Sequence, residues 1–274
     1  MPINKFLNLA ACEIEGTFLN LKGCRGPAAI NDVSITYDGS VRVNEKYPKR
    51  FWDLCKEMGN GHSPKQLAHV GEVVSPPFDN LDNAKQWMLK YYPDATNSSC
   101  GLHFHVSLNN PGYYSCLMEK EFYLYMKESL GKFADEQKLN KIFRERFEGK
   151  TEWAKKYCRD EFIPLKQAFV SQKNYNDAGR NRYTLLNFCY GLHETVEIRV
   201  FTAHMPVKRA VKCLEWYVNV ITEYLEQNYE KFCNTELTTE SVDIECDSDN
   251  IFAQADESND DIAVDEFELE EIAG

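Results

Sequence analysis

The 274-residue chain has 43% hydrophobic and 13% aromatic residues, which is enough to bury a core and excludes a wholly disordered protein. No apolar run approaches the roughly 18 residues that a membrane-spanning helix needs, so we expect no membrane partner. The net charge of −12 is uneven: residues 236–274 contain 15 acidic residues and no Lys or Arg, which leaves 28 acidic and 31 basic residues elsewhere. A body this close to neutral carries no strong signal for nucleic-acid binding.

The cysteines and the charge distribution predict the organisation of the chain. Ten cysteines lie at scattered spacings without a CxxC pair, which argues against a zinc ribbon or a disulfide scaffold. We interpret them as reduced core residues of a cytoplasmic protein. Residues 1–232 are expected to form the globular domain, and residues 233–274 an acidic, disordered tail. Alternatively, the tail docks a basic partner or folds back on the body.

The first half of the chain is predicted to be rich in strands. Residues 6–18 are predicted as a strand, and residues 33–43 as a hairpin that turns at Asp38-Gly39. A strand over residues 66–74 ends at two prolines, which cannot continue a ladder. A helix over residues 81–92 and a strand over residues 101–108 follow.

The second half is predicted to begin with helices. Hydrophobic spacing predicts a helical region over residues 115–148. Strands are predicted over residues 182–188 and 195–201. A long helix that starts at a proline is predicted over residues 206–232. Strands, then helices, then strands and a helix indicate an α+β fold with a mainly antiparallel sheet.

Ionisable side chains lie two residues apart on three of the predicted strands. The pairs are Glu13 with Glu15, His103 with His105, and Glu197 with Arg199, and a fourth strand carries Glu72. Because side chains alternate along a strand, both members of a pair share a face, while the apolar residue between them faces the other way. We therefore predict one apolar sheet face and one face of carboxylates, imidazoles and a guanidinium. Each pair taken singly also fits an ordinary amphipathic strand.

The charged face predicts a particular chemistry. Converging carboxylates repel one another and need positive charge, which divalent cations supply. Oxygen ligands favour Mg²⁺ or Mn²⁺. Two such ions beside Arg199 would be typical of a site that binds phosphate groups. The chain has no GxxxxGK[ST] loop and no GxGxxG after a strand, so metals and side chains would hold nucleotide phosphates. A zinc hydrolase also uses His-x-His, but the glutamate of a cupin and the first-strand position of an amidohydrolase are both missing.

These segments resemble the glutamine synthetase superfamily. Residues 101–107 are similar to its Gly-x-His-x-His-x-Ser strand, residues 195–199 to its late Glu-x-Arg strand, and residues 13–15 to its opening Glu-x-Glu strand. The amidoligase family within it is closer still, and resembles the chain in CEIEGTF, DGS, GEVVSPPF, CGLHFHV, and RYTLLNF before TVEIRVF. The resemblance implies a glutamine synthetase-like α+β domain, with a curved, mainly antiparallel sheet and helices packed on one face.

The resemblance also implies roles for the matched residues. The expected metal ligands are Glu13, Glu15 and Glu72, with His103 and Glu197 completing a second site. The expected ATP or phosphate ligands are His105, Ser107, Arg180, Arg182 and Arg199. Catalysis is expected to depend on Glu72, Glu197 and Arg199. The substrate candidates are Asp38, Ser40 and Asn187, which also fit plain turn or strand-end roles.

The activity that the resemblance implies is ATP-dependent joining of a carboxylate to an amine. The substrate carboxylate would attack the γ-phosphate of ATP, and the amine would displace phosphate from the acyl-phosphate. Two Mg²⁺ or Mn²⁺ ions would serve as cofactors. The sequence identifies neither substrate. Two alternatives remain: a phosphotransferase on the same fold, and a non-catalytic interaction protein that keeps the fold.

Overall fold

The computed structural model describes residues 3–19, 29–30, 33–38, 40–42, 46–58, 61, 63–148, 185–189 and 194–231. All of them belong to the first of two compact units, Met1–Thr239 and Glu240–Gly274. The expected acidic tail, residues 233–274, therefore lies outside the described residues. The same holds for Arg180 and Arg182.

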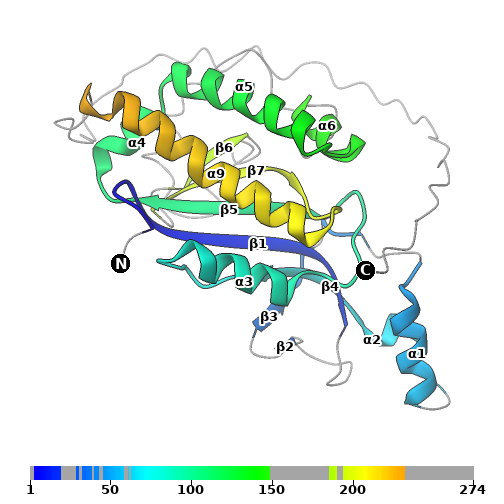
Figure 1. Cartoon of the computed structure of the whole chain (residues 1–274). Helices are drawn as coiled ribbons and strands as arrows, with labels where there is room; N and C mark the ends of the chain where they lie inside the picture. Colours follow the sequence, from blue (N-terminus) through cyan, green and yellow to red (C-terminus); the bar gives the residue numbers. More distant parts are fainter. Residues whose placement is uncertain are drawn as a thin grey trace, which may run out of the picture. The chain divides into compact units, whose positions relative to one another are not determined.

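The described strands form one antiparallel sheet in the order β2-β3-β4-β1-β5-β7-β6 (Figure 1). The central strand β1 pairs with β4 on one side and with β5 on the other. Beyond β5 lie β7 and β6, and beyond β4 lie β3 and β2. The bounds are β1 Leu7–Leu19, β2 Ala29–Ile30, β3 Val33–Thr36, β4 Ala68–Val74, β5 Gly101–Leu108, β6 Leu186–Cys189 and β7 Thr195–Thr202. The α+β class and the antiparallel sheet are confirmed.

The structure differs from two of the strand predictions. The hairpin over residues 33–43 is wrong, because β3 pairs with β2 and β4, while residues 40–42 form a turn and coil. The backbone N–H of Ser40 donates to Asp38 Oδ1 at 2.7 Å, so the Asp38 side chain closes a local turn instead. The strand over residues 66–74 starts later, because Pro64–Leu67 form the short helix α2.

The helical region expected over residues 115–148 is three helices, α4 Pro111–Leu117, α5 Lys120–Glu136 and α6 Lys141–Phe147. Asparagine caps explain two of the starts: the side chain of Asn110 accepts from the N–H of Gly112, and that of Asn140 accepts from the N–H of Phe143. The other helices are α1 Lys49–Glu57, α3 Leu81–Tyr91 and α9 Val207–Asn228, followed by the 3₁₀ turn η2 Tyr229–Lys231. The predicted helices over residues 81–92 and 206–232 are confirmed.

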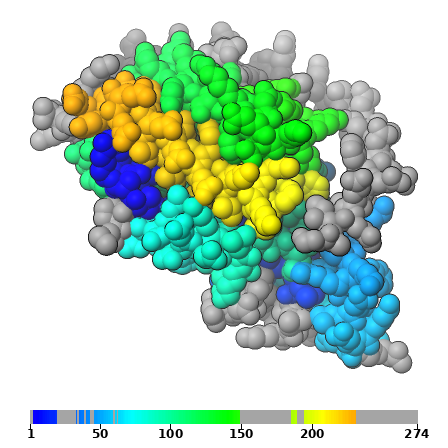
Figure 2. Space-filling model, in the orientation of Figure 1, coloured from blue at the N-terminus to red at the C-terminus, as the bar shows by residue number. Residues whose placement is uncertain are grey.

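Helices cover one face of the sheet, as Figure 1 shows. The residues between the charged pairs, Ile14, Phe104 and Ile198, are fully buried on this face. Helix α9 lies between α3 and the α5–α6 layer in the space-filling view (Figure 2). The hydroxyl of Tyr217 on α9 donates to the carbonyl of Val196 on β7 at 3.0 Å, which anchors the helix to the sheet. Among the described residues, no helix has the length and apolar character needed to cross a bilayer.

Candidate functional site

The opposite face of the sheet carries the predicted ionisable residues in neighbouring columns. Strand register sets three cross-strand pairs: Glu72 opposite Glu15, His103 opposite Glu13, and His105 opposite Glu197. Since β4, β1, β5 and β7 are adjacent in the sheet, residues far apart in the chain meet at this face. Strand register and side-chain alternation together therefore build the site.

The first cluster combines imidazole and carboxylate donors. One ligand atom from each of Glu13, His105 and Glu197 lies within 4.8 Å of the other two. The Nε2 atom of His105 is 3.2 Å from Glu13 Oε1 and 3.6 Å from Glu197 Oε1. The Nδ1 atom of His103 approaches the same carboxylates, at 3.2 Å from Glu13 and 3.6 Å from Glu197. The guanidinium of Arg199 forms an ion pair with Glu197 Oε1.

The second cluster consists of oxygen donors alone. Ligand atoms of Glu15, Asp38 and Glu72 lie within 4.8 Å of one another. The backbone N–H of Gly101 donates to Glu15 Oε2 at 2.6 Å, which orients that carboxylate. The Nε2 atom of His103 lies 4.0 Å from Glu15 Oε1, so His103 lies between the two clusters.

The glycine that precedes His103 is required by close packing in the site. A Cβ atom at Gly101 would lie 2.7 Å from His103 Nε2 and 3.0 Å from Glu15 Oε1. Both residues face the same side of the sheet, because Gly101 and His103 are two positions apart on β5. The spacing Gly-x-His therefore leaves room for the imidazole beside the carboxylate.

Charge is compensated within the first cluster. Burial alone would raise the pKa of Glu13, but hydrogen bonds to His103 and His105 outweigh it and hold the pKa well below its usual range. Burial likewise opposes ionisation of Glu197, yet Arg199 and His105 lower its pKa. For His105, burial favours the neutral ring, while Glu197 and Glu13 raise the pKa above its ordinary value. The carboxylates are therefore anionic near neutral pH.

The second cluster lacks such compensation. Burial, followed by repulsion from the neighbouring Glu13, Asp38 and Glu15, raises the pKa of Glu72 to about 7. Arg199 opposes this shift as the smallest contribution. A divalent cation among these oxygens would remove the repulsion, and an all-oxygen donor set suits Mg²⁺ or Mn²⁺. The residues present therefore fit the metals that the resemblance implies.

The three substrate candidates lie close to other residues of the site. Asp38, expected to face substrate, lies in the second cluster with Glu15 and Glu72. Asn187 is buried and donates from Nδ2 to Glu197 Oε2 at 2.9 Å. The third, Ser40, donates its backbone N–H to Asp38 and forms part of that turn.

The expected nucleotide ligands lie at different positions relative to the first cluster. His105 belongs to the first cluster, while Ser107 lies farther along β5, opposite Leu9, and its Oγ accepts from the N–H of Leu9 at 3.1 Å. Arg199 borders the first cluster. The roles of these side chains toward ATP stay predictions.

Sequence reasoning missed Thr195, whose Oγ1 lies 3.2 Å from His105 Nδ1. Thr195 precedes Glu197 by two residues on β7, so its place on the polar face could have been read from side-chain alternation. The hydroxyl contacts one ring nitrogen of His105, and the other ring nitrogen faces Glu13 and Glu197. Thr195 is therefore placed to set the tautomer and orientation of the ring.

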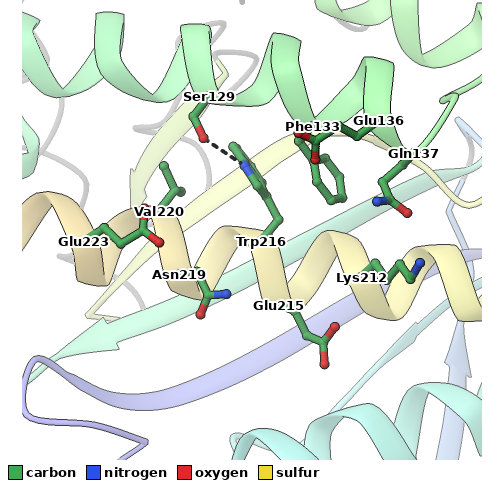
Figure 3. Close-up of a pocket in the computed structure, with 10 residues that line it drawn as sticks. All are labelled: Ser129, Phe133, Glu136, Gln137, Lys212, Glu215, Trp216, Asn219, Val220 and Glu223. Atoms are coloured by element: carbon green, nitrogen blue, oxygen red, sulfur yellow. Dashed lines mark hydrogen bonds between the residues drawn. The ribbon is translucent and has the colours of Figure 1, made fainter.

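A separate hollow of about 400 Å³ lies on the helical side, between α5 and α9 (Figure 3). Its lining includes Ser129, Phe133, Trp216 and Glu223, and the indole N–H of Trp216 donates to Ser129 Oγ at 3.1 Å. No residue of the two clusters lines it. The candidate site is therefore on the polar face and distinct from this hollow.

The polar face carries two groups of metal-suited ligand atoms, with the guanidinium of Arg199 beside the first. This arrangement suits a ligand with several adjacent negative oxygens, such as a nucleotide phosphate chain.

Comparison of the chain with family models, with characterised proteins and with solved structures gives no match.

Proposed function

We propose that this chain is an ATP-dependent carboxylate–amine ligase that uses Mg²⁺ or Mn²⁺. The observation that carries the proposal is the meeting of two metal-suited clusters and Arg199 on one sheet face. A structural polar face would present solvated side chains, whereas Glu15, His103, His105 and Glu197 are all buried here. Buried charges of this density are typical of sites that bind and transform ligands.

The two clusters would hold the metals. One set is Glu13, His105 and Glu197, and the other is Glu15, Asp38 and Glu72, with His103 able to serve either. The cations would offset the charge of the carboxylates and of the nucleotide phosphates.

Arg199 is proposed to bind the phosphoryl group that is transferred. Its guanidinium is largely buried and is held by Glu197, so its orientation is fixed before substrate arrives. A planar, permanently charged guanidinium forms bidentate contacts with phosphate oxygens. Placement of this charge where negative charge develops would lower the barrier to transfer.

The reaction that follows has two balanced steps. A carboxylate oxygen of the first substrate bonds to the γ-phosphorus of ATP, and the bond to the bridging oxygen breaks to release ADP. The amine nitrogen then bonds to the acyl carbon, phosphate leaves with the carbon–oxygen bonding pair, and the nitrogen loses a proton. The protein contributes by holding both partners in position and by compensating charge.

The cysteines support the proposed cytoplasmic location. Cys12, Cys55, Cys100, Cys116 and Cys213 are buried and form no disulfide with one another. Buried thiols of this kind are typical of reducing compartments. The acidic tail is proposed as a solubilising segment or as a docking segment for a basic partner.

Product analysis tests the proposal. The full chain is incubated with ATP, Mg²⁺ and mixtures of carboxylates and amines, while phosphate release and new masses are followed. The expected result is phosphate release that needs both substrates, together with an amide product. A phosphorylated product without free phosphate would indicate a phosphotransferase instead. ATP turnover that persists in Arg199→Ala would overturn the role given to Arg199.

A further inference from the structure

We infer that Asn187 is a positioning residue that acts through Glu197, rather than a substrate contact. The inference deepens the proposed function and rests on its metal site. Asn187 lies directly opposite Glu197 in the register of β6 and β7. Its amide therefore reaches the carboxylate across a single strand-to-strand spacing.

The two oxygens of Glu197 have separate surroundings. Oε2 accepts from Asn187 Nδ2 at 2.9 Å. Oε1 lies 3.6 Å from His105 Nε2, 3.6 Å from His103 Nδ1, and next to the guanidinium of Arg199. Asn187 thus holds one oxygen while the other faces the cluster.

Burial makes this contact consequential. Glu197 is 1% exposed and Asn187 is 7% exposed, so little water is available to replace the hydrogen bond. The terminal torsion of a glutamate is broad, and a fixed donor on one oxygen restricts it. Such partners of ligating carboxylates orient them, and their loss typically weakens metal affinity about 10–100-fold.

The neutral amide is also suited to this place. Glu197 already pairs with Arg199, and a Lys or Arg in place of Asn187 would add a second positive charge and further reduce its attraction for a cation. The amide of Asn187 donates a hydrogen bond without adding charge. The carboxylate therefore keeps its negative charge for a metal while its orientation is fixed.

The test is a double-mutant cycle on metal binding by the full chain. Mn²⁺ binding is measured by electron paramagnetic resonance for wild type, Asn187→Ala, Glu197→Ala and the double variant. We expect Asn187→Ala to weaken one class of site about 10–100-fold. In the Glu197→Ala background, Asn187→Ala should have no further effect on Mn²⁺ affinity, because its effect on the metal is transmitted through that carboxylate.

Asn140→Ala serves as the matched control, because it removes an asparagine that caps α6 and donates to the carbonyl of His204, away from both clusters. It should lower stability and leave Mn²⁺ affinity unchanged. Asn187→Ser is measured alongside, so that the inference is testable even where Asn187→Ala does not fold.

Each outcome separates the inference from the function on which it rests. Unchanged Mn²⁺ affinity in Asn187→Ala and Asn187→Ser, with a loss in Glu197→Ala, would overturn the positioning role alone. The positioning role would also be overturned if the losses of Mn²⁺ affinity in Asn187→Ala and Glu197→Ala simply added in the double variant. Additive losses would indicate that Asn187 has a general structural role. Absence of Mn²⁺ binding by the wild type would overturn the metal site itself, and with it the proposed function.

Discussion

Replacement of Glu72 by Gln should stabilise the metal-free protein at alkaline pH. Burial and the neighbouring Glu13, Asp38 and Glu15 raise the pKa of Glu72 to about 7, so its ionised form is unfavourable in the folded state. Gln keeps the size of the protonated side chain and removes the charge. The variant should therefore lack the repulsion between Glu72 and the neighbouring carboxylates that destabilises the metal-free wild type.

The magnitude follows from the pKa. The rise is from 4.5 to about 7, and each unit corresponds to about 1.4 kcal/mol of interaction free energy. Since Glu72 is only partly buried, we expect Glu72→Gln to raise the free energy of unfolding by about 2–3 kcal/mol at pH 8. This corresponds to an increase of roughly 4–12 °C in Tm for a domain of this size. A raised pKa means that protonation favours the folded state. This stabilisation is complete below pH 4.5 and is lost as pH rises through about 7.

The assay is thermal unfolding followed by circular dichroism, in EDTA, from pH 4.5 to pH 8.5. The difference in Tm between Glu72→Gln and wild type should grow across this interval and be near zero at its acidic end. Excess Mg²⁺ should stabilise the wild type more than the variant. The control is Glu128→Gln on the exposed surface of α5, which should show no such pH dependence. An increase in Tm that is the same at every pH, or no increase, would show that ionised Glu72 does not destabilise the folded protein.

The geometry of the two clusters also determines how two further substitutions and Mg²⁺ binding should behave. Gly101→Ala places a Cβ atom 2.7 Å from His103 Nε2, so it should weaken Mn²⁺ binding and destabilise the fold by about 1–3 kcal/mol in denaturant titrations. Thr195→Val removes the hydroxyl beside His105 and should lower Mn²⁺ affinity about tenfold, measured by calorimetry; unchanged affinity would contradict a role for this contact. Mg²⁺ binding should release protons near pH 7 and release few at pH 9, because Glu72 is partly protonated only at the lower pH; calorimetry in buffers of different ionisation enthalpy measures this.

The polar face was predictable because it depends on local spacing alone. Glu13 and Glu15, or His103 and His105, must share a face once their segment is a strand, since side chains alternate. The burial of the intervening residues then decides which face meets the helices. The separation of apolar and charged faces therefore follows from the sequence.

The grouping of ligands was not predictable, because it depends on contacts between distant segments. Asp38 joins Glu15 and Glu72 because the segment after β3 is tied to the loop before β5. The backbone N–H of Arg42 donates to Ser99 Oγ at 2.9 Å, and Asn97 Nδ2 donates to the carbonyl of Arg42 at 2.8 Å. Turn signals at residues 38 and 39 indicate only a local reversal, which explains why the hairpin prediction was wrong.

The distinction between the two histidines has a similar origin. The resemblance assigns His103 to a metal site and His105 to the phosphates, whereas His105 completes the cluster with Glu13 and Glu197. His103 contacts Glu13 as well and extends toward Glu15. Ring orientation depends on partners such as Thr195, which spacing within β5 does not reveal.

Calorimetric titration of ATP, with and without Mg²⁺, is a direct test of whether the two clusters form a metal-dependent nucleotide site. The wild type and Glu197→Ala are compared, with Glu223→Ala in the α5–α9 hollow as a control remote from the clusters. We expect ATP binding by the wild type that requires Mg²⁺, is lost in Glu197→Ala and is kept in Glu223→Ala. Binding of equal strength in all three proteins, or no binding with any divalent cation, would contradict it.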